Sequence, residues 1–144
     1  MPSRPIRHII ADQKLVLAYP GTCVSEAAAL MKESNVGAVL VIEAGHLAGI
    51  FTERDAVFRV LAAGLDPQRT TLCEVMTHKP QTIAPDRPFG HALHLMFEGG
   101  YRHVPVVEHD ELVGIVSARD ALSSDLAQFE SDVAEREHVA EILG

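Results

Sequence analysis

The sequence predicts an α/β protein built from two β-α-β-β-α repeats packed about a pseudo-twofold axis, plus a C-terminal amphipathic helix. The first observation is an ungapped internal repeat, in which residues 49–56 (GIFTERDA) recur as residues 114–121 (GIVSARDA), an offset of 114 − 49 = 65 residues. The second is that helical and strand periodicities follow in the same order within each copy. The third is an apolar content of 47% in a chain of 144 residues, which is typical of a globular protein. Because two copies are too few for a solenoid, we expect one compact body in which each half buries its apolar face against the other.

The opening elements of the two copies are a short extended segment and a helix. Extended segments are expected at residues 15–17 and 81–84. Apolar residues at helical spacing predict a helix over residues 25–33. In the second copy, Asp86 and Pro88 predict the cap and first turn of the equivalent helix, which Gly99 and Gly100 should end.

A hairpin and a second helix complete each copy. Short β-branched runs predict buried strands, and a small turn joins each to a second apolar run. Thr52 and Ser117 then stand where helix N-caps belong. The expected strand pairs are 38–42 with 47–51 and 104–107 with 112–116, the following helices are 56–63 and 121–128, and residues 71–76 form a short amphipathic turn.

These elements divide the chain into residues 1–70 (the first repeat with an N-terminal segment), 71–128 (the second repeat) and 129–144 (an acidic C-terminal helix). From Leu126 into this last segment, apolar residues recur at steps of three, four or seven with acids on the other face, which predicts an amphipathic helix. Packing on its own module, dimerisation and docking to a partner all remain open for it. The apolar positions are Leu126, Phe129, Val133, Ala140 and Leu143.

Charge and cysteine content exclude several classes of protein. A net charge of −8 argues against nonspecific binding to nucleic acid or to an anionic membrane. Two cysteines, Cys23 and Cys73, are too few for a disulfide framework and indicate a reducing compartment. No apolar run is long enough to cross a bilayer, so we expect a cytoplasmic protein. No catalytic motif is present, and we do not expect an enzyme.

The repeated unit resembles the cystathionine beta-synthase (CBS) domain, and the tandem pair resembles a Bateman module of the stand-alone bacterial type. The resemblance covers residues 15–128 and is most specific in residues 102–107 (RHVPVV) and in the doubled pattern of glycine, two apolar residues, Thr or Ser, two residues and Asp. It implies a regulatory module with a cleft between its halves that binds AMP, ADP, ATP, NAD or S-adenosylmethionine. It also implies a homodimer that signals to an unknown protein partner and requires no cofactor beyond this adenine nucleotide.

The residues of the doubled pattern allow two interpretations, one as ligand contacts and one as helix caps. A strand that passes through Thr52 or Ser117 into a helix leaves free backbone N–H groups and a positive dipole end, which suits a phosphate. Arg54 and Arg119 lie in the first turn, where a guanidinium could donate to phosphate oxygens, and the resemblance assigns Asp55 and Asp120 to ribose hydroxyls. Alternatively, Thr52 with Asp55 and Ser117 with Asp120 are only capping boxes.

The resemblance also supplies an apolar slot for adenine in each copy. The second copy is nearer the family pattern, since it has Thr82 and Pro105 where the first has Leu17 and Leu40. We therefore expect the Ser117/Asp120 site to bind more readily than the Thr52/Asp55 site. The slot residues are Thr82, Ile83, Val104 and Pro105, with His103 as a neighbour, in one site and Leu17, Ala38 and Val39 in the other.

Two competing functions remain. One is a dimeric interaction scaffold that binds no nucleotide. The other is a small metal-dependent enzyme using His91 and His94, which share a helix face but have no third ligand fixed nearby. We prefer surface or cleft-edge positions for these histidines.

Overall fold

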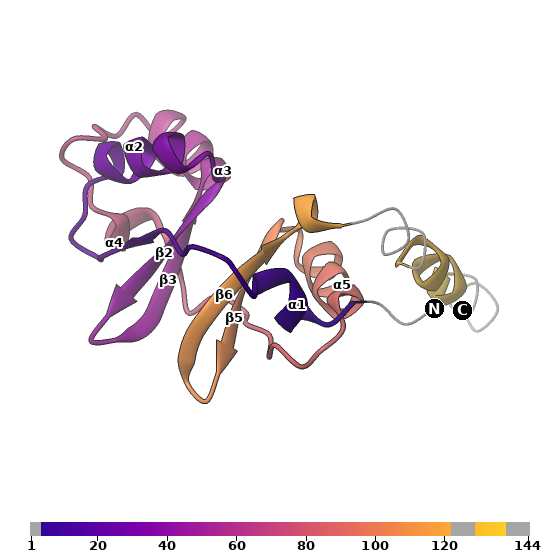
Figure 1. Ribbon diagram of the computed structural model, residues 1–144. Helices are drawn as coiled ribbons and strands as arrows, with labels where there is room; N and C mark the ends of the chain where they lie inside the picture. The colour runs from indigo at the N-terminus through magenta and orange to yellow at the C-terminus, as the bar shows by residue number, and fades with distance from the viewer. Residues whose placement is uncertain (1–3, 122–128, 138–144) are drawn as a thin grey trace. The chain divides into compact units, whose positions relative to one another are not determined.

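The computed structural model describes residues 4–121 and 129–137 and divides the chain into two compact units (Figure 1). Each unit is α/β, as the sequence predicts. The first-repeat unit consists of residues 14–81 and 109–112, and the second-repeat unit consists of residues 1–13, 82–108 and 113–144. Each unit therefore contains one repeat together with a segment from elsewhere in the chain.

The first-repeat unit is built on a four-stranded sheet of order β1-β2-β3-β4. Strand β1 runs parallel to β2, whereas β2 with β3 and β3 with β4 are antiparallel pairs. The β2–β3 hairpin turns at Ala44 and Gly45, whose φ angles of 51° and 78° are both left-handed, as a two-residue hairpin turn that follows the strand twist requires. The strands are β1 (Leu17–Ala18), β2 (Ala38–Glu43), β3 (His46–Thr52) and β4 (Thr77–His78).

Three helical segments accompany this sheet. Helix α2 (Val24–Ser34) confirms the predicted helix and ends at Asn35, which has a left-handed φ of 53°. After β3 the chain enters α3 (Glu53–Asp55) and continues as a π-helix, η1 (Ala56–Leu61), so this helix begins three residues earlier than predicted. The predicted turn at residues 71–76 is the short helix α4 (Leu72–Val75). The core holds Ala18, Val24, Ala27, Met31, Val39, Val41, Phe51, Val60, Leu72, Val75 and Met76.

The second-repeat unit has the hairpin of β5 (His103–Glu108) and β6 (Glu111–Ser117) and the helix α5 (Phe89–Gly99). Gly100, with a φ of 71°, ends α5 as predicted. The predicted strand at residues 81–84 is reduced to a parallel bridge between Ile83 and Val106. The core holds Ile6, Ile10, Ile83, Phe89, Ala92, Leu93, Met96, Val104, Val106 and Val116.

Two predicted helix starts in this unit are wrong. Pro88 is the N-cap of α5 and lies outside its first turn, and Asp86 does not cap the helix. This fits the fixed φ of proline, which here continues an extended backbone (ψ 147°). Beyond β6 the chain makes one 3-10 turn, η2 (Ala118–Asp120), and is extended again at Ala121, so no helix begins there. The rest of the predicted helix, residues 122–128, lies outside the described residues.

The segments that precede the two repeats are exchanged between the units. Helix α1 (Ile6–Ile10) buries Ile6 and Ile10 in the core of the second-repeat unit. It approaches β6 closely at Gly114, where a Cβ atom would lie 2.7 Å from Ile10 Cγ2. Conversely, α4 and β4 complete the first-repeat unit and approach β3 at Gly49, where a Cβ atom would lie 2.7 Å from the carbonyl oxygen of Thr77. The compact units thus divide the chain differently from the sequence boundary at residues 70 and 71.

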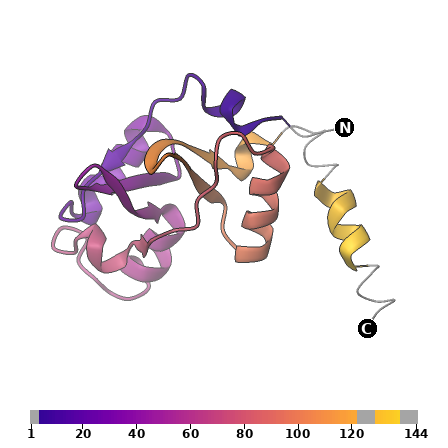
Figure 2. The same ribbon diagram turned by 90° about the horizontal axis from the view of Figure 1, so that it is seen from below.

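The C-terminal helix is present over residues 129–137 and runs beside α5 (Figure 2). The Phe129 ring lies 5.0 Å from the His94 ring and 5.6 Å from the Phe97 ring. Arg136 pairs with Glu98 at 2.9 Å. The helix therefore packs on its own unit, one of the roles left open by the sequence. The predicted apolar positions Leu126, Ala140 and Leu143 lie outside the described residues.

Candidate functional site

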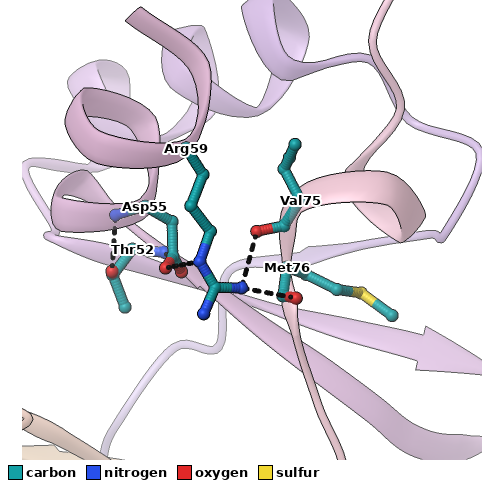
Figure 3. A network of polar contacts seen from close by, with 5 residues as sticks. All are labelled: Thr52, Asp55, Arg59, Val75 and Met76. Carbon is teal, nitrogen blue, oxygen red and sulfur yellow. Dashed lines mark hydrogen bonds and ion pairs between the residues drawn. The ribbon is translucent and has the colours of Figure 1, made fainter. Parts of the chain in front are cut away.

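The first strand-to-helix junction, at the end of β3, is a closed network of polar contacts (Figure 3). The backbone N–H of Thr52 donates to Asp55 Oδ2 at 3.0 Å, and the N–H of Asp55 donates to Thr52 Oγ1 at 3.2 Å. Arg59 Nε lies 3.5 Å from Asp55 Oδ1. Asp55 is only 9% exposed, so its carboxylate is held among protein groups and has little contact with water.

The second junction, at the end of β6, repeats the carboxylate contacts but is more open. The N–H of Ser117 donates to Asp120 Oδ2 at 2.8 Å, and the Ser117 hydroxyl lies 3.4 Å from the same oxygen. Asp120 is half-buried. Its backbone carbonyl accepts a hydrogen bond of 2.7 Å from Arg4 Nη2, which ties the N-terminal segment to this junction.

At both junctions, the backbone N–H groups predicted to bind phosphate are partly used within the protein. The first helical N–H of each is already used, because Glu53 N–H donates to Gly37 O and Ala118 N–H donates to Arg102 O, both at 3.0 Å. At the second junction the described helix is a single 3-10 turn, which carries little of the dipole of a full helix. Binding of an anion at either junction would depend on side chains more than on the backbone.

The two junction arginines differ in their surroundings. Arg54 is exposed, and its guanidinium carbon lies 5.5 Å from the centre of the Phe58 ring, so it extends along its own helix. Arg119 is also exposed and forms no hydrogen bond or ion pair with any residue in the described part of the chain. Arg119 is thus the better placed of the two to meet an anion from solvent.

The strands sort the predicted slot residues of the first copy onto two faces of the sheet. Ala38 is paired with Thr52, so both side chains lie on the same face. Val39 is paired with Phe51, and both are fully buried in the core on the opposite face. Leu17 is 45% exposed, whereas the next residue, Ala18, enters the core. Leu17 and Ala38 therefore share the Thr52 face, and Val39 could meet a ligand there only through its backbone.

The second copy shows the same alternation. Ile83 and Val104 belong to the core of their unit, whereas Thr82 is exposed and His103 is half-buried. Pro105 is buried without being part of that core cluster. The hydrogen bond from Ala118 N–H to Arg102 O places the start of β5 beside the end of β6, so the structure brings His103 close to the Ser117 junction.

Sequence reasoning missed two arginines. Arg59 joins Asp55 to the carbonyl oxygens of Val75 and Met76, at 3.2 and 3.1 Å. Arg4 joins the N-terminal segment to Asp120. The spacing of Asp55 and Arg59, four residues apart on a helix, was a signal for an ion pair. Nothing in the local sequence pointed to Arg4, because its partner is 116 residues away.

The two histidines considered as metal ligands, His91 and His94, lie in different surroundings. His94 is largely buried, and its Nε2 lies 3.4 Å from Asp132 Oδ2 in the C-terminal helix. His91 is exposed. Within residues 4–121 and 129–137, no three His, Cys, Asp or Glu side chains are grouped so that they could hold a metal ion.

The fold and the doubled junction have clear relatives. The family model of the CBS domain matches residues 6–62 and 72–126. A CBS domain-containing protein of Bacillus subtilis, YhcV, is 41% identical over 101 residues, which cover 70% of this chain and 71% of that protein. The Meiotically up-regulated gene 70 protein of Schizosaccharomyces pombe is 44% identical over 110 residues, but this chain spans only 15% of its length.

Solved structures of CBS-domain proteins have the same fold as this chain. A protein with CBS domains from Burkholderia ambifaria has 29% identity and a TM-score of 0.79, with 85% of this chain and 94% of that chain covered. Among the residues that the structure describes, no helix combines the length and the apolar character that a bilayer-spanning segment needs. Each of the two family matches contains one copy of the junction, at residues 49–56 in the first and at residues 114–121 in the second. The chain therefore belongs to the CBS-domain family and carries two CBS domains in tandem.

Proposed function

We propose that this chain is a regulatory module that binds an adenosine-containing ligand, with its principal site at the Ser117/Asp120 junction. The observation that carries the proposal is the half-buried carboxylate of Asp120, which lies beside a serine hydroxyl at the end of a strand in a CBS domain. A carboxylate is a double acceptor and suits the vicinal hydroxyls of a ribose. Arg119, exposed beside it, would supply charge-assisted hydrogen bonds to a phosphate.

The neighbouring residues suit the remainder of such a ligand. Thr82, His103 and Pro105 lie outside the core cluster of the second-repeat unit, and His103 starts the strand that lies beside Ser117. We assign them to the base. Ile83 and Val104 would take part through backbone groups, because their side chains are committed to the core. The Thr52 junction, with Leu17, Ala38, Val39, Arg54 and Asp55, is the second, weaker candidate.

A related fold is known with such a ligand. A CBS-domain protein from Pyrobaculum aerophilum, 23% identical with a TM-score of 0.77, was solved in complex with AMP. At that identity the likeness concerns the fold alone, so it supports the proposal by showing that this fold holds a nucleotide. The ligand class for this chain rests on the residues above.

We also propose that the module acts as a homodimer. The outer face of η1 carries the exposed apolar residues Val57, Phe58 and Leu61, at 48%, 63% and 70% exposure, an apolar surface that a second copy would cover. A hexameric CBS-domain protein from cyanobacteria, 28% identical, shows that a relative forms oligomers. Regulation would follow from linkage, since a ligand shifts an equilibrium only by its differential affinity for the two states.

Thermal denaturation with AMP, ATP, NAD and S-adenosylmethionine tests the binding proposal. A ligand that binds only the folded state at 100 times its Kd should add about 2.7 kcal/mol to the free energy of unfolding and raise Tm. Isothermal titration should then show that Asp120→Ala weakens binding more than Asp55→Ala, while sedimentation of the same samples reports the dimer. If none of the four compounds binds, the chain is a scaffold and the proposal fails.

A further inference from the structure

The two junctions repeat one sequence pattern but differ in what surrounds the carboxylate. Both oxygens of Asp55 are engaged: Oδ2 accepts from Thr52 N–H at 3.0 Å, and Oδ1 lies 3.5 Å from Arg59 Nε. In Asp120, Oδ2 takes both contacts from Ser117, and Oδ1 has no partner among the residues that the structure describes. The acceptor that remains open at the second junction is thus filled at the first.

Arg59 is fixed in place from its other side. Its Nη1 donates to the carbonyl oxygens of Val75 and Met76, at 3.2 and 3.1 Å, at the end of α4 (Figure 3). A guanidinium has five donors in one rigid plane, so it can hold these carbonyls and the Asp55 carboxylate at once. The side chain is therefore a bridge between two elements of the first-repeat unit, although half of it is exposed.

The repeat offset shows that this bridge is specific to the first copy. The position equivalent to Arg59 is 59 + 65 = 124, and residue 124 is a serine, which carries no charge. No cation is therefore supplied at that position of the second copy. The difference is one of sequence and does not depend on how the two units are arranged.

We propose that Arg59 is a specificity-determining residue that closes the first of the two equivalent ribose sites, so that the chain binds one adenosine ligand, at Asp120. A ribose hydroxyl would have to displace the guanidinium, which is held in place by the opposite charge of Asp55 and by its two hydrogen bonds to the carbonyl oxygens of Val75 and Met76. Exposure acts in the same direction, since Asp55 is 9% exposed and Asp120 is half-buried. This inference rests on the proposed function, because it assumes that Asp120 contacts ribose.

The test is the stoichiometry of binding to the full chain, measured by isothermal titration with AMP and, as a second probe, NAD. The wild-type chain should bind one equivalent. Arg59→Gln removes the charge but keeps amide donors for the two carbonyls, and it should bind two equivalents. Arg59→Lys, which keeps a cation beside Asp55, should restore a stoichiometry of one. The matched control is Arg69→Ala, which removes an exposed arginine of the same unit and should leave one site.

A double variant separates the opening of a site from a general change in structure. Asp120→Ala should abolish binding in the wild-type background, and adding Arg59→Gln should restore a single site, now at Asp55. Circular dichroism and Tm confirm that each variant folds, and Arg59→Met replaces Arg59→Gln if the glutamine variant does not. Two equivalents in the wild type, or one in both Arg59→Gln and Arg59→Met, would overturn the inference while leaving the proposed function intact. No binding by any variant would overturn both.

Discussion

The exchange of segments between the units predicts that Ile6 stabilises the unit of the second CBS domain, although it lies at the start of the first family match. Ile6 is fully buried among Ile83, Phe89 and Val104 in the core of the second-repeat unit. Replacing it with alanine removes three carbons, worth about 0.8 kcal/mol each in transfer free energy, or about 2.4 kcal/mol. The cavity left behind adds to this loss, so Ile6→Ala should lower the free energy of unfolding by about 3–4 kcal/mol.

Native-state hydrogen exchange combined with urea denaturation would locate this effect. Backbone amides of β5 and β6 should lose protection in Ile6→Ala, whereas amides of β2 and β3, which belong to the other unit, should lose less. His8→Ala changes an exposed residue of the same helix and should shift the free energy of unfolding by less than about 0.5 kcal/mol. A loss of protection centred on β2 and β3, or a destabilisation below about 1 kcal/mol, would refute the assignment of α1 to the second-repeat unit.

Two further substitutions test local backbone geometry. Ala44→Gly should stabilise the first-repeat unit by about 0.5–1 kcal/mol in urea denaturation, because relief of the strain of alanine at a φ of 51° exceeds the added freedom of the unfolded chain; a destabilisation would contradict this. Gly49→Ala should destabilise the chain by about 1–3 kcal/mol, because the new Cβ would lie 2.7 Å from both Met76 Sδ and the Thr77 carbonyl oxygen, and a fall in Tm with unchanged circular dichroism would measure it.

Local patterns predicted most of the secondary structure. Short β-branched and apolar runs located β2, β3, β5 and β6, and helical spacing located α2, because these elements bury apolar side chains in the core of their own unit. The repeat offset and the glycine pair at its end located α5. The predicted capping boxes are also present at the two junctions, since Asp55 accepts a hydrogen bond from the N–H of Thr52 and Asp120 accepts one from the N–H of Ser117. The local sequence pattern gave a wrong result at Ala121. A helix start was predicted there, but the backbone is extended.

The candidate site was predicted in part. The repeat offset located Thr52, Asp55, Ser117 and Asp120. The slot residues, however, were assigned to one site without regard to the alternation of side chains between the two faces of a strand. Val39 is consequently a core residue while Ala38 lies on the Thr52 face. Alternation is a local rule and could have separated them. The partners of Arg59 at Val75 and Met76 could not have been found this way, because the fold alone brings α4 beside the helix after β3.

Two arginines join the strand-to-helix junctions to the segments exchanged between the units. Arg59 binds the first junction to the end of α4, the helix that leads into the second repeat. Arg4 binds the carbonyl of Asp120, at the second junction, to the segment that leads into the first repeat. Each of these contacts thus joins a junction to a segment of chain that continues into the other repeat. Cutting the chain between residues 70 and 71 should therefore destabilise both CBS domains, since each would no longer be covalently joined to the helix that completes its core.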